Sequence, residues 1–401
     1  MTTNGFALLG VADDLVAVLD GSGITEPFEI QETSIPDVLA GRDVCGRAKT
    51  GSGKTLAFGL PMVQRLGAAA PGRPRGLVLV PTRELAVQVT DVLRELGAVR
   101  DMKVLTVYGG SSMRKQIDAA QRKTGIVVAT PGRLIDLMDR KVLRLDDVEM
   151  VAIDEADQMA DMGFLPQVRR IMRQVPENHQ TLLYSATLDG QVGALVNAYM
   201  RDPARHEVDT RDDQIEMMEH RFLKVHHMDK VKVAAALANN NTRTLMFVRT
   251  KHGCDRVAKN LVDVGVDAKA IHGDLHQRQR EKALSQFADG TIPVLVATNV
   301  AARGLHIDDV DLVVHYDPPD DPKTYVHRSG RTARAGESGL VVTLVEWDQV
   351  NEVLGIQRRA GLNVPIIKMF SNDARLATLN EWDPPEELAP FSSAKRKRRR
   401  F

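Results

Sequence analysis

Short runs of apolar and β-branched residues alternate along the chain with segments of helical periodicity. In the first half, these runs predict strands at Gly76–Val80, Val104–Val107, Ile126–Ala129, Met150–Ile153 and Thr181–Tyr184. In the second half, they predict strands at Thr244–Val248, Ala268–Ile271, Val294–Ala297, Leu312–His315 and Leu340–Leu344. Intervening segments such as Glu84–Leu96, Gly253–Val264 and Arg278–Phe287 predict helices. This alternation is typical of parallel sheets covered on both faces, so we predict an α/β protein with two tandem lobes of similar architecture.

Changes in polarity along the chain predict the domain boundaries. The first lobe covers residues 1–207, a polar segment without periodicity at 208–214 forms a linker, and the second lobe covers 215–367. Residues 368–401 contain three prolines and the cationic run Lys395 to Arg400, and they predict a disordered basic tail. The sequence leaves open whether this run is a solvated tail, an arm that gathers phosphates or an import signal.

Composition places the chain among soluble globular proteins of two or three domains, because it has 401 residues and is 43% hydrophobic. The 53 basic and 53 acidic residues cancel, so net charge says nothing about partners. Cys45 and Cys254 lack the spacing of a metal site and predict reduced core residues. No signal-peptide pattern and no membrane-spanning stretch is evident, so we expect a cytoplasmic protein.

The segment from Ala48 to Thr55 has the composition of a phosphate-binding loop, with Thr50, Gly51, Ser52 and Gly53 leading to Lys54 and Thr55. The glycines allow a tight turn whose N–H groups can face phosphate oxygens, at the positive end of a helix starting near Lys54. Lys54 would neutralise phosphate charge, and the Thr55 hydroxyl would reach Mg²⁺. An ordinary flexible loop is the alternative interpretation.

Two adjacent carboxylates, Asp154 and Glu155, follow the apolar run Met150–Ile153. Asp154 can hold Mg²⁺, through water because this ion keeps much of its hydration shell, and Glu155 can orient and deprotonate a water molecule. A plain strand followed by a solvated acidic turn is the alternative. The phosphate loop and the acidic pair, each placed at a strand end, together predict a nucleoside triphosphatase.

Several further segments make the chain resemble a DEAD-box RNA helicase over roughly residues 6 to 345. Gly23 to Gln31, with Phe6 upstream, resembles the adenine-recognising Q motif of that family. The other similar segments are Pro81–Ala86, Gly109–Gly110, Thr130–Arg133, Asp154–Asp157, Ser185–Thr187, Phe247–Thr250, His272–Asp274, Gln277 with Arg280, Ala297–Gly304 and His327–Arg334. The resemblance implies two RecA-like lobes with a nucleotide cleft between them, and ATP and Mg²⁺ as cofactors.

The resemblance also assigns roles to individual residues. Phe6, Gln31, Gly304 and His306 would contact the nucleotide, and Arg331 and Arg334 would act as arginine fingers from the second lobe. Asp157, Ser185 and Thr187 would couple the nucleotide site to lobe closure. The residues implied to bind RNA are Pro81, Thr82, Arg83, Gly109, Gly110, Thr130, Pro131, Gly132, Arg133, Arg249, Gly273 and Thr298. Such contacts address phosphate and sugar, so they position a strand without sequence preference.

Three positions depart from the family pattern. Ile24 stands where the Q motif commonly has an aromatic residue, Asn299 where an aspartate is usual after Thr298, and His306 where an aspartate contacts the ribose. A neutral imidazole accepts one hydrogen bond where a carboxylate accepts more, so we expect weaker ATP affinity in the closed state, with pH dependence near neutrality.

An RNA-stimulated ATPase that separates short duplexes is the leading hypothesis. An ATP-gated RNA clamp with low turnover and a DNA helicase are the alternatives. A monomer is expected, and ribosome-assembly or RNA-decay proteins are candidate partners.

Overall fold

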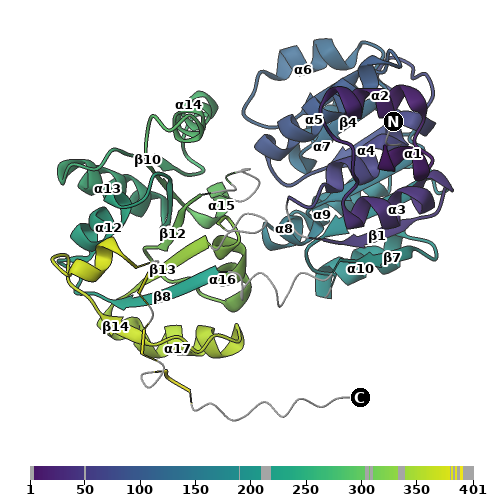
Figure 1. Cartoon of the computed structure of the whole chain (residues 1–401). Helices are drawn as coiled ribbons and strands as arrows, with labels where there is room; N and C mark the ends of the chain where they lie inside the picture. Colours follow the sequence, from purple (N-terminus) through teal and green to yellow (C-terminus); the bar gives the residue numbers. More distant parts are fainter. Residues whose placement is uncertain are drawn as a thin grey trace, which may run out of the picture. The chain divides into compact units, whose positions relative to one another are not determined.

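The computed structural model describes residues 4–48, 51–188, 190–208, 218–302, 307, 310–332, 339–379, 381–382, 384–385 and 389–391. The chain divides into two compact units, Met1–Thr210 and Arg211–Phe401, which we call lobe one and lobe two. Each contains a seven-stranded sheet in which every pairing is parallel (Figure 1). The α/β prediction is therefore confirmed.

Lobe one has the strand order β3-β4-β2-β5-β6-β1-β7. Its strands are β1 (Val44–Arg47), β2 (Gly76–Leu79), β3 (Val104–Val107), β4 (Ile126–Ala129), β5 (Met150–Asp154), β6 (Gln180–Ser185) and β7 (Ala204–Glu207). Its helices are α1 (Gly5–Leu8), α2 (Asp13–Gly21), α3 (Glu29–Leu39), α4 (Lys54–Arg65), α5 (Arg83–Ala98), α6 (Met113–Ala120), α7 (Pro131–Asp139), α8 (Ala156–Asp161), α9 (Leu165–Met172) and α10 (Gly190–Tyr199).

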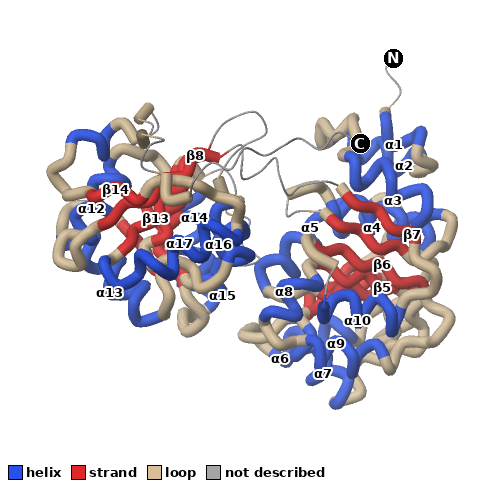
Figure 2. Tube along the Cα trace, turned by 90° about the horizontal axis from the view of Figure 1, so that it is seen from below, coloured by secondary structure: helices blue, strands red, loops and turns tan. Residues whose placement is uncertain are grey.

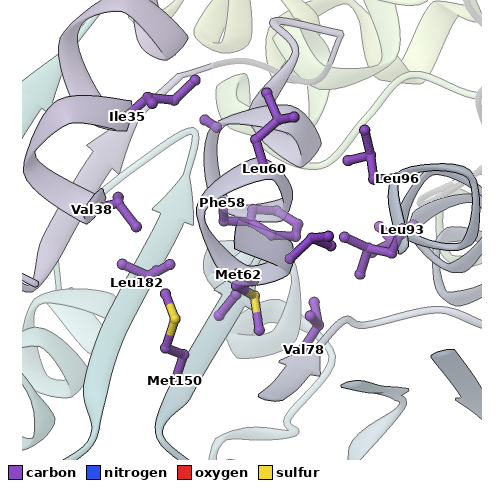
Figure 3. Close-up of a cluster of buried hydrophobic side chains, with 14 of the residues drawn as sticks. Ile35, Val38, Phe58, Leu60, Met62, Val78, Leu93, Leu96, Met150 and Leu182 are labelled. Atoms are coloured by element: carbon purple, nitrogen blue, oxygen red, sulfur yellow. The ribbon is translucent and has the colours of Figure 1, made fainter. Parts of the chain in front are cut away.

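Side chains that alternate along the strands of lobe one fill two cores, one on each face of the sheet. On β2, Val78 belongs to the core beneath α1 to α5, and its neighbours Leu77 and Leu79 belong to the opposite core. Figure 3 shows the first core, where Phe58 and Met62 of α4 lie between the sheet and the adjoining helices. In Figure 2, helices lie on both sides of the layer formed by β5, β6 and β7.

Lobe two has the order β10-β11-β9-β12-β13-β8-β14, which is the order of lobe one with seven added to every strand number. Its strands are β8 (Met218–Lys224), β9 (Thr244–Phe247), β10 (Ala268–Ile271), β11 (Val294–Ala297), β12 (Leu312–His315), β13 (Gly339–Val345) and β14 (Ile366–Lys368). Its helices are α12 (Lys230–Asn239), α13 (Lys251–Asp263), α14 (Gln277–Ala288), α15 (Asn299–Ala302), α16 (Pro322–Ser329), η1 (Trp347–Gln349), α17 (Val350–Arg359) and η2 (Ala374–Ala377). The two lobes are thus two copies of one architecture.

All ten predicted strands are present to within one residue at each end, but the sequence pattern missed β1, β7, β8 and β14. The edge strand β7 (Ala-Arg-His-Glu) and the inner strand β8 (Met-Glu-His-Arg-Phe-Leu-Lys) carry several polar residues, and the edge strand β14 has only three residues. The pattern misses the inner strand β1 because this strand contains Gly46. A Cβ on Gly46 would lie 2.5 Å from Cδ1 of Tyr184, so the sheet requires glycine at this position, and glycine does not contribute to an apolar run.

The predicted start of a disordered tail at residue 368 is wrong. Met369, Leu376 and Leu379 are buried in the core of lobe two. The backbone N–H of Met369 donates to the carbonyl of Lys224 at 2.9 Å, and the side chain of Asp229 accepts from Ser371. The chain after β14 therefore packs as part of lobe two, and the cationic run at 395–400 lies outside the described residues.

Both cysteines are buried free thiols, as the sequence predicts. Burial raises the pKa of Cys45 to about 11 and that of Cys254 to about 12, so both remain protonated at neutral pH. Within the described part of the chain, no helix combines the length and apolar character that a membrane span requires.

Candidate nucleotide and nucleic-acid sites

The motif residues at the carboxyl ends of the lobe-one strands fall into two spatial groups. Those predicted to handle the nucleotide follow β1, β5 and β6, which are neighbours in the sheet. Those predicted to contact RNA follow β2, β3 and β4, which are also neighbours. In lobe two, Arg249, Gly273 and Thr298 follow β9, β10 and β11, the equivalents of β2, β3 and β4. Ligands of open parallel sheets bind at these strand ends, so the fold offers adjoining places for two ligands.

The predicted phosphate loop connects β1 to α4, which begins at Lys54 as expected. Gly51 and Gly53 have φ values of +83° and +79°, a conformation that residues with a Cβ adopt at a cost. Gly53 is the N-cap of α4 and has no side chain, so it cannot compete for the N–H groups of the first turn. Ser52 and Thr55 are half-buried beside it, and Thr50 lies outside the described residues. This is the backbone geometry that suits an anion at a helix start.

Lys54 faces the acidic pair across the loop. Its Nζ donates to the carbonyl of Ala48 at 3.2 Å and lies 3.9 Å from Oδ1 of Asp154, and both charged groups are buried. A buried ammonium beside a buried carboxylate limits the cost of removing either charge from water. The ammonium is thus held next to the loop that would receive phosphates.

Glu155 has an unusual backbone conformation. It is buried, with φ +51° and ψ +50°, and it turns the chain sharply from β5 into α8. The other described non-glycine residues with positive φ are Asp101, Lys141 and Asp202, which are exposed. This conformation costs an L-residue about 1–2 kcal/mol. Such strain is often found at functional positions and agrees with the predicted role of Glu155.

The donor set fits a magnesium ion held mainly by phosphate and water. Asp154 and Thr55 supply one carboxylate and one hydroxyl, and no group of three or more His, Cys, Asp or Glu side chains in the described residues could form a protein cage. Mg²⁺ in nucleotide sites is typically bound by one or two carboxylates together with substrate phosphates.

The predicted coupling residues meet between β6 and α8. The backbone N–H of Asp157 donates to Oγ of Ser185 at 3.1 Å, and Oγ1 of Thr187 donates to Oδ2 of Asp157 at 3.5 Å. The carbonyl of Ser185 also accepts from the N–H of Ala48 at 3.0 Å. Ser185 therefore joins the acidic motif to the phosphate loop, whereas a coupling role stays a prediction.

Gln31 connects the Q segment to the phosphate loop. It is 1% exposed, its Oε1 accepts from the N–H of Phe28 at 2.8 Å, and its Nε2 donates to the carbonyl of Gly53 at 2.8 Å. Phe6 lies elsewhere: its ring is 0% exposed in the core of lobe one. We therefore correct the prediction that Phe6 contacts the nucleotide, because an enclosed ring presents no face to a base.

The predicted RNA residues of lobe one form a connected surface. Arg83, the first residue of α5, lies against the glycine pair, since a Cβ on Gly110 would be 2.1 Å from its Nη1. Thr82 caps that helix by accepting from the N–H of Leu85. Arg133 donates to the carbonyl of Ser111 at 3.3 Å, which joins α7 to the loop after Gly109 and Gly110.

Thr130 is the N-cap of α7 and Pro131 its first residue, as predicted. Pro81, Thr82, Thr130 and Pro131 are buried, whereas Gly110 and Gly132 are exposed. The four buried residues shape the loops after β2 and β4, whereas the glycines and arginines of this surface remain accessible to a ligand.

In lobe two, Asp317 organises the loop that carries Arg249. Its Oδ2 accepts from the N–H of Arg249 at 2.8 Å, and the guanidinium of Arg249 lies 2.9 Å from Oδ1 of Asp320. Gly273 is exposed, and Thr298 accepts from the N–H of Ala301 at 3.3 Å. Arg331 is half-buried just after α16, whereas Gly304, His306 and Arg334 lie outside the described residues.

Sequence reasoning did not anticipate the partner of Asn299. The buried guanidinium of Arg328 donates to Oδ1 of Asn299 at 2.5 Å and to the carbonyl of Asp317 at 2.8 Å. Burial lowers the pKa of Arg328 to about 10, partly offset by the carboxylates of Asp317 and Asp320. The neutral amide of Asn299 thus accepts a hydrogen bond from the buried guanidinium of Arg328, at a position where the family pattern has a carboxylate.

Comparison with known proteins agrees with this geometry. The family description "DEAD/DEAH box helicase" matches residues 28–195, and "Helicase conserved C-terminal domain" matches residues 224–336. The chain is 40% identical over 360 residues to the DEAD-box ATP-dependent RNA helicase CshA of Bacillus cereus, covering 89% of this chain and 68% of the relative. It is 41% identical over 398 residues to CshA of Listeria monocytogenes, covering 97% and 76%.

Solved structures give the same result. The structure of S. cerevisiae Dbp5 bound to RNA and ADP BeF3 matches with a TM-score of 0.82 and 30% identity, covering 92% of this chain and 96% of that one. Its two-lobed fold agrees with the RecA-like architecture predicted here.

Proposed function

Because this chain belongs to the DEAD-box family of ATP-dependent RNA helicases, we propose that it hydrolyses ATP in response to RNA and uses lobe closure to separate short RNA duplexes. The observation that carries this function is the joint placement of Lys54, Asp154 and Glu155 beside the loop between β1 and α4.

The residues of lobe one divide the work at the nucleotide. The N–H groups at the start of α4 would receive phosphate oxygens, and Lys54 would balance their charge. Asp154 and Thr55 would hold Mg²⁺, which when bound screens charge on the phosphates. Glu155 would accept a proton from the attacking water. These residues cradle the substrate, but none in this group supplies a cation that arrives with the transition state.

Lobe two would supply that cation. Arg331 follows α16, and we propose that it, together with Arg334, reaches the γ-phosphate when the lobes close. Hydrolysis would then depend on closure, and RNA that contacts both lobes would favour the closed state. The proposed RNA contacts are Arg83 and the Gly109–Gly110 amides in lobe one, and Arg249, Gly273 and Thr298 in lobe two. They address the backbone, so recognition would be independent of sequence.

We further propose that the chain acts as a monomer in the cytoplasm, in processes such as ribosome assembly or RNA decay. Two features support this setting: each lobe encloses its own hydrophobic cores, and both cysteines are free.

Steady-state ATP turnover tests the proposal, measured without nucleic acid, with RNA and with single-stranded DNA. Stimulation by RNA alone is expected. Equal stimulation by DNA indicates a DNA helicase, and tight ATP-dependent RNA binding without turnover indicates a clamp.

The two-lobe mechanism has its own test. Replacing Arg331 and Arg334 together with alanine should lower kcat about 10³-fold or more. Arg359→Ala, an exposed arginine on α17 of the same lobe, is the matched control and should not change kcat. Intact turnover in the double variant would refute the mechanism.

A further inference from the structure

Lobe two exposes large apolar side chains where β8, β13 and β14 end. Met228, Trp347 and Phe370 are 76%, 61% and 45% exposed, although side chains of this kind are normally buried. Met228 follows β8, Trp347 follows β13 and Phe370 follows β14. The three strands are neighbours in the sheet, in the order β13-β8-β14 (Figure 1). These residues therefore gather at one end of the carboxyl edge of the sheet. Together with Lys224 and Lys368, we call them the aromatic–lysine patch.

Two lysines accompany the aromatic rings. Lys224 and Lys368 are the last residues of β8 and β14 and lie opposite each other in register, so their side chains leave the same face of the sheet. Nζ of Lys224 lies 3.5 Å from the centre of the Trp347 ring, and Nζ of Lys368 lies 4.9 Å from the centre of the Phe370 ring. Within the part of the chain that the structure describes, neither ammonium forms an ion pair with a carboxylate. Two unpaired cations thus lie side by side, each next to an exposed ring.

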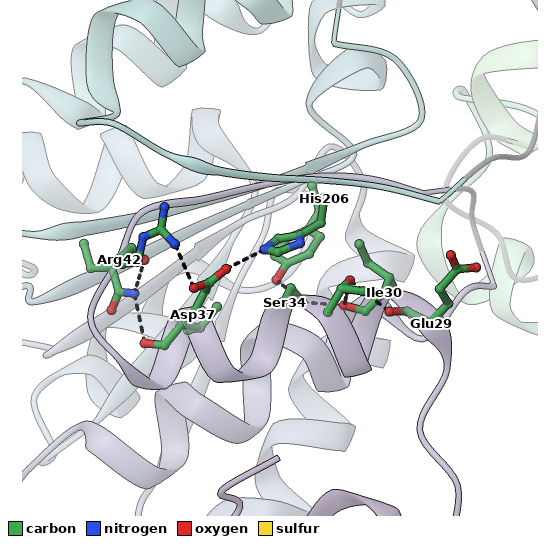
Figure 4. Close-up of polar contacts among 10 residues, drawn as sticks. Glu29, Ile30, Ser34, Asp37, Arg42 and His206 are labelled. Carbon is green, nitrogen blue, oxygen red and sulfur yellow. Dashed lines mark hydrogen bonds and ion pairs between the residues drawn. The ribbon is translucent and has the colours of Figure 1, made fainter. Parts of the chain in front are cut away.

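The corresponding place in lobe one is neutralised from within. There the last residues of β1 and β7 are Arg47 and Glu207, which lie opposite each other and form an ion pair at 2.9 Å. His206 of β7 in turn contacts Asp37 of α3 at 2.9 Å (Figure 4). Lobe two repeats the strand order but puts two lysines where lobe one has a cation and a carboxylate. Like charges side by side cost stability, so this arrangement favours a bound anion.

The backbone on both sides of Phe370 is fixed. Met369, which precedes it, is buried and donates its N–H to the carbonyl of Lys224 at 2.9 Å. Ser371, which follows it, donates its N–H to Oδ2 of Asp229 at 2.7 Å. The ring is therefore held at the surface by anchored neighbours, and the carboxylate of Asp229 is engaged within lobe two.

Trp347 is supported in the same way. Glu346, which precedes it, accepts from Nζ of Lys230 at 2.8 Å, and its N–H donates to Oε1 of Gln349 at 2.9 Å. Asp348, which follows it, is exposed, so its carboxylate offsets one of the two lysine charges and the patch stays positive. Rings that are already held in place lose little conformational freedom when a ligand binds, which favours their use as a binding surface.

We propose that the aromatic–lysine patch binds single-stranded RNA, with bases stacked on Trp347 and Phe370 and phosphates beside Lys224 and Lys368. This inference extends the proposed RNA-dependent function and rests on it. Aromatic faces combined with cations hold a single strand without reading its sequence. An acidic peptide would satisfy the lysines but has no flat base for the two rings, so the combination favours RNA.

The patch lies apart from the proposed RNA contacts of lobe two but at the same edge of the sheet. Those contacts follow β9, β10 and β11, and the strand order places β12 between β9 and β13. Three strand spacings of about 4.8 Å separate β9 from β8. An RNA strand bound at β9 therefore has the patch within reach of its next few nucleotides, and the patch would lengthen the RNA site of lobe two.

Tryptophan fluorescence of the full chain tests the stacking directly, because the sequence contains only Trp347 and Trp382. Trp382 packs against the core of lobe two, outside the patch. Trp382→Phe leaves Trp347 as the reporter, and its fluorescence should be quenched by polyuridine. Trp347→Phe leaves Trp382 as the reporter, and its fluorescence should not change. Inorganic polyphosphate, which carries the charge without bases, should quench neither variant.

Dissociation constants for polyuridine and polyphosphate separate stacking from charge. Trp347→Ala should weaken polyuridine binding about tenfold and leave polyphosphate binding unchanged. Replacing Lys224 and Lys368 together with glutamine should weaken the binding of both polymers and lower the salt dependence of log K for polyuridine by about 1.4. Lys259→Gln and Val262→Ala, at exposed positions of α13, are the matched controls and should change neither affinity.

Two results would overturn the inference. If polyuridine leaves the fluorescence of Trp347 unquenched and binds Trp347→Ala as tightly as the wild type, the patch is not an RNA site and a protein partner becomes its occupant. If Trp347→Ala loses affinity for polyuridine and polyphosphate equally, the ring only positions Lys224 and no base stacks on it. Absence of RNA-stimulated turnover in the wild type counts against the proposed function, and the quenching of Trp347 still decides the role of the patch.

Discussion

Gly51 and Gly53 offer a matched pair of substitutions within one loop. Both have nearly the same positive φ, +83° and +79°. A Cβ on Gly51 would meet no atom within 4 Å, whereas a Cβ on Gly53 would lie 2.2 Å from Nε2 of Gln31. Replacing each with alanine therefore imposes the same backbone strain, but only Gly53→Ala also displaces the Q segment.

The expected magnitudes follow from these two effects. Holding an alanine in the left-handed region costs about 1–2 kcal/mol, which is the whole expected effect of Gly51→Ala. Overpacking adds about 1–3 kcal/mol at Gly53, so Gly53→Ala should cost about 2–5 kcal/mol. Alanine also restricts the unfolded chain, but equally in both variants, so the difference between them isolates the clash.

Urea unfolding of the full chain measures this difference. Both tryptophans, Trp347 and Trp382, lie in lobe two, so their fluorescence reports that lobe and should not change. Far-ultraviolet circular dichroism reports both lobes, and its lobe-one transition should shift more for Gly53→Ala than for Gly51→Ala. KM for ATP should rise in the same order. Equal effects of the two substitutions would show that Gln31 does not pack on the loop as described.

Three further predictions concern lobe two, and tryptophan fluorescence in urea measures each. Asn299→Asp places a carboxylate beside the already desolvated Arg328 and should raise the free energy of unfolding by about 1 kcal/mol. An unchanged free energy of unfolding would show that the guanidinium does not face residue 299. The pKa of His315 lies well below its usual value, chiefly because of burial and then because of Arg328 and His220. The unfolded chain therefore binds more protons than the folded chain as pH falls below about 6.5, so the free energy of unfolding should fall by up to about 1.4 kcal/mol per pH unit. His315→Phe should reduce this slope, and the same slope in the variant and the wild type would contradict the prediction. Ending the chain after residue 367 should unfold lobe two, because three buried apolar side chains of about 1.5–3 kcal/mol each are lost, whereas ending it after residue 391 should not.

The strands that form most of each core could be located from the sequence because burial on both faces requires continuous apolar runs. That signal is absent from β1, whose glycine makes room for Tyr184, and from β14, a three-residue strand at the sheet edge. The strand order was not predictable either, because pairing is decided by contacts between segments far apart in the chain.

The sequence indicates the candidate site most directly where one segment contains a whole chemical unit. The phosphate loop and the acidic pair are such segments, and Lys54 and Asp154 do lie together. Phe6 was misassigned because an isolated aromatic residue gives the same pattern whether it is buried or binds a ligand. Nothing in the sequence indicates, conversely, that the ring of Phe28 is exposed beside Gly53.

The strand order has a consequence for how the two ligands are separated. Along the chain, the motifs predicted to bind nucleotide and RNA alternate. In the sheet, however, β5 and β6 lie between β1 and β2, so the nucleotide motifs after β1, β5 and β6 form one group and the RNA motifs after β2, β4 and β3 form another. The only boundary between the two groups in lobe one is therefore the β2–β5 pair, where Leu79 lies opposite Ile153. Arg83 follows β2 and Asp154 is the last residue of β5, so they are the RNA and nucleotide residues that this boundary brings closest in the strand order. Because lobe two repeats this order, Arg249 after β9 and the loop carrying Asp317 after β12 lie at the equivalent boundary, where Asp317 already binds the backbone of Arg249. Signals between RNA and ATP would accordingly pass through this boundary in each lobe, and Asp317→Asn should weaken RNA stimulation of ATP turnover more than it changes the basal rate.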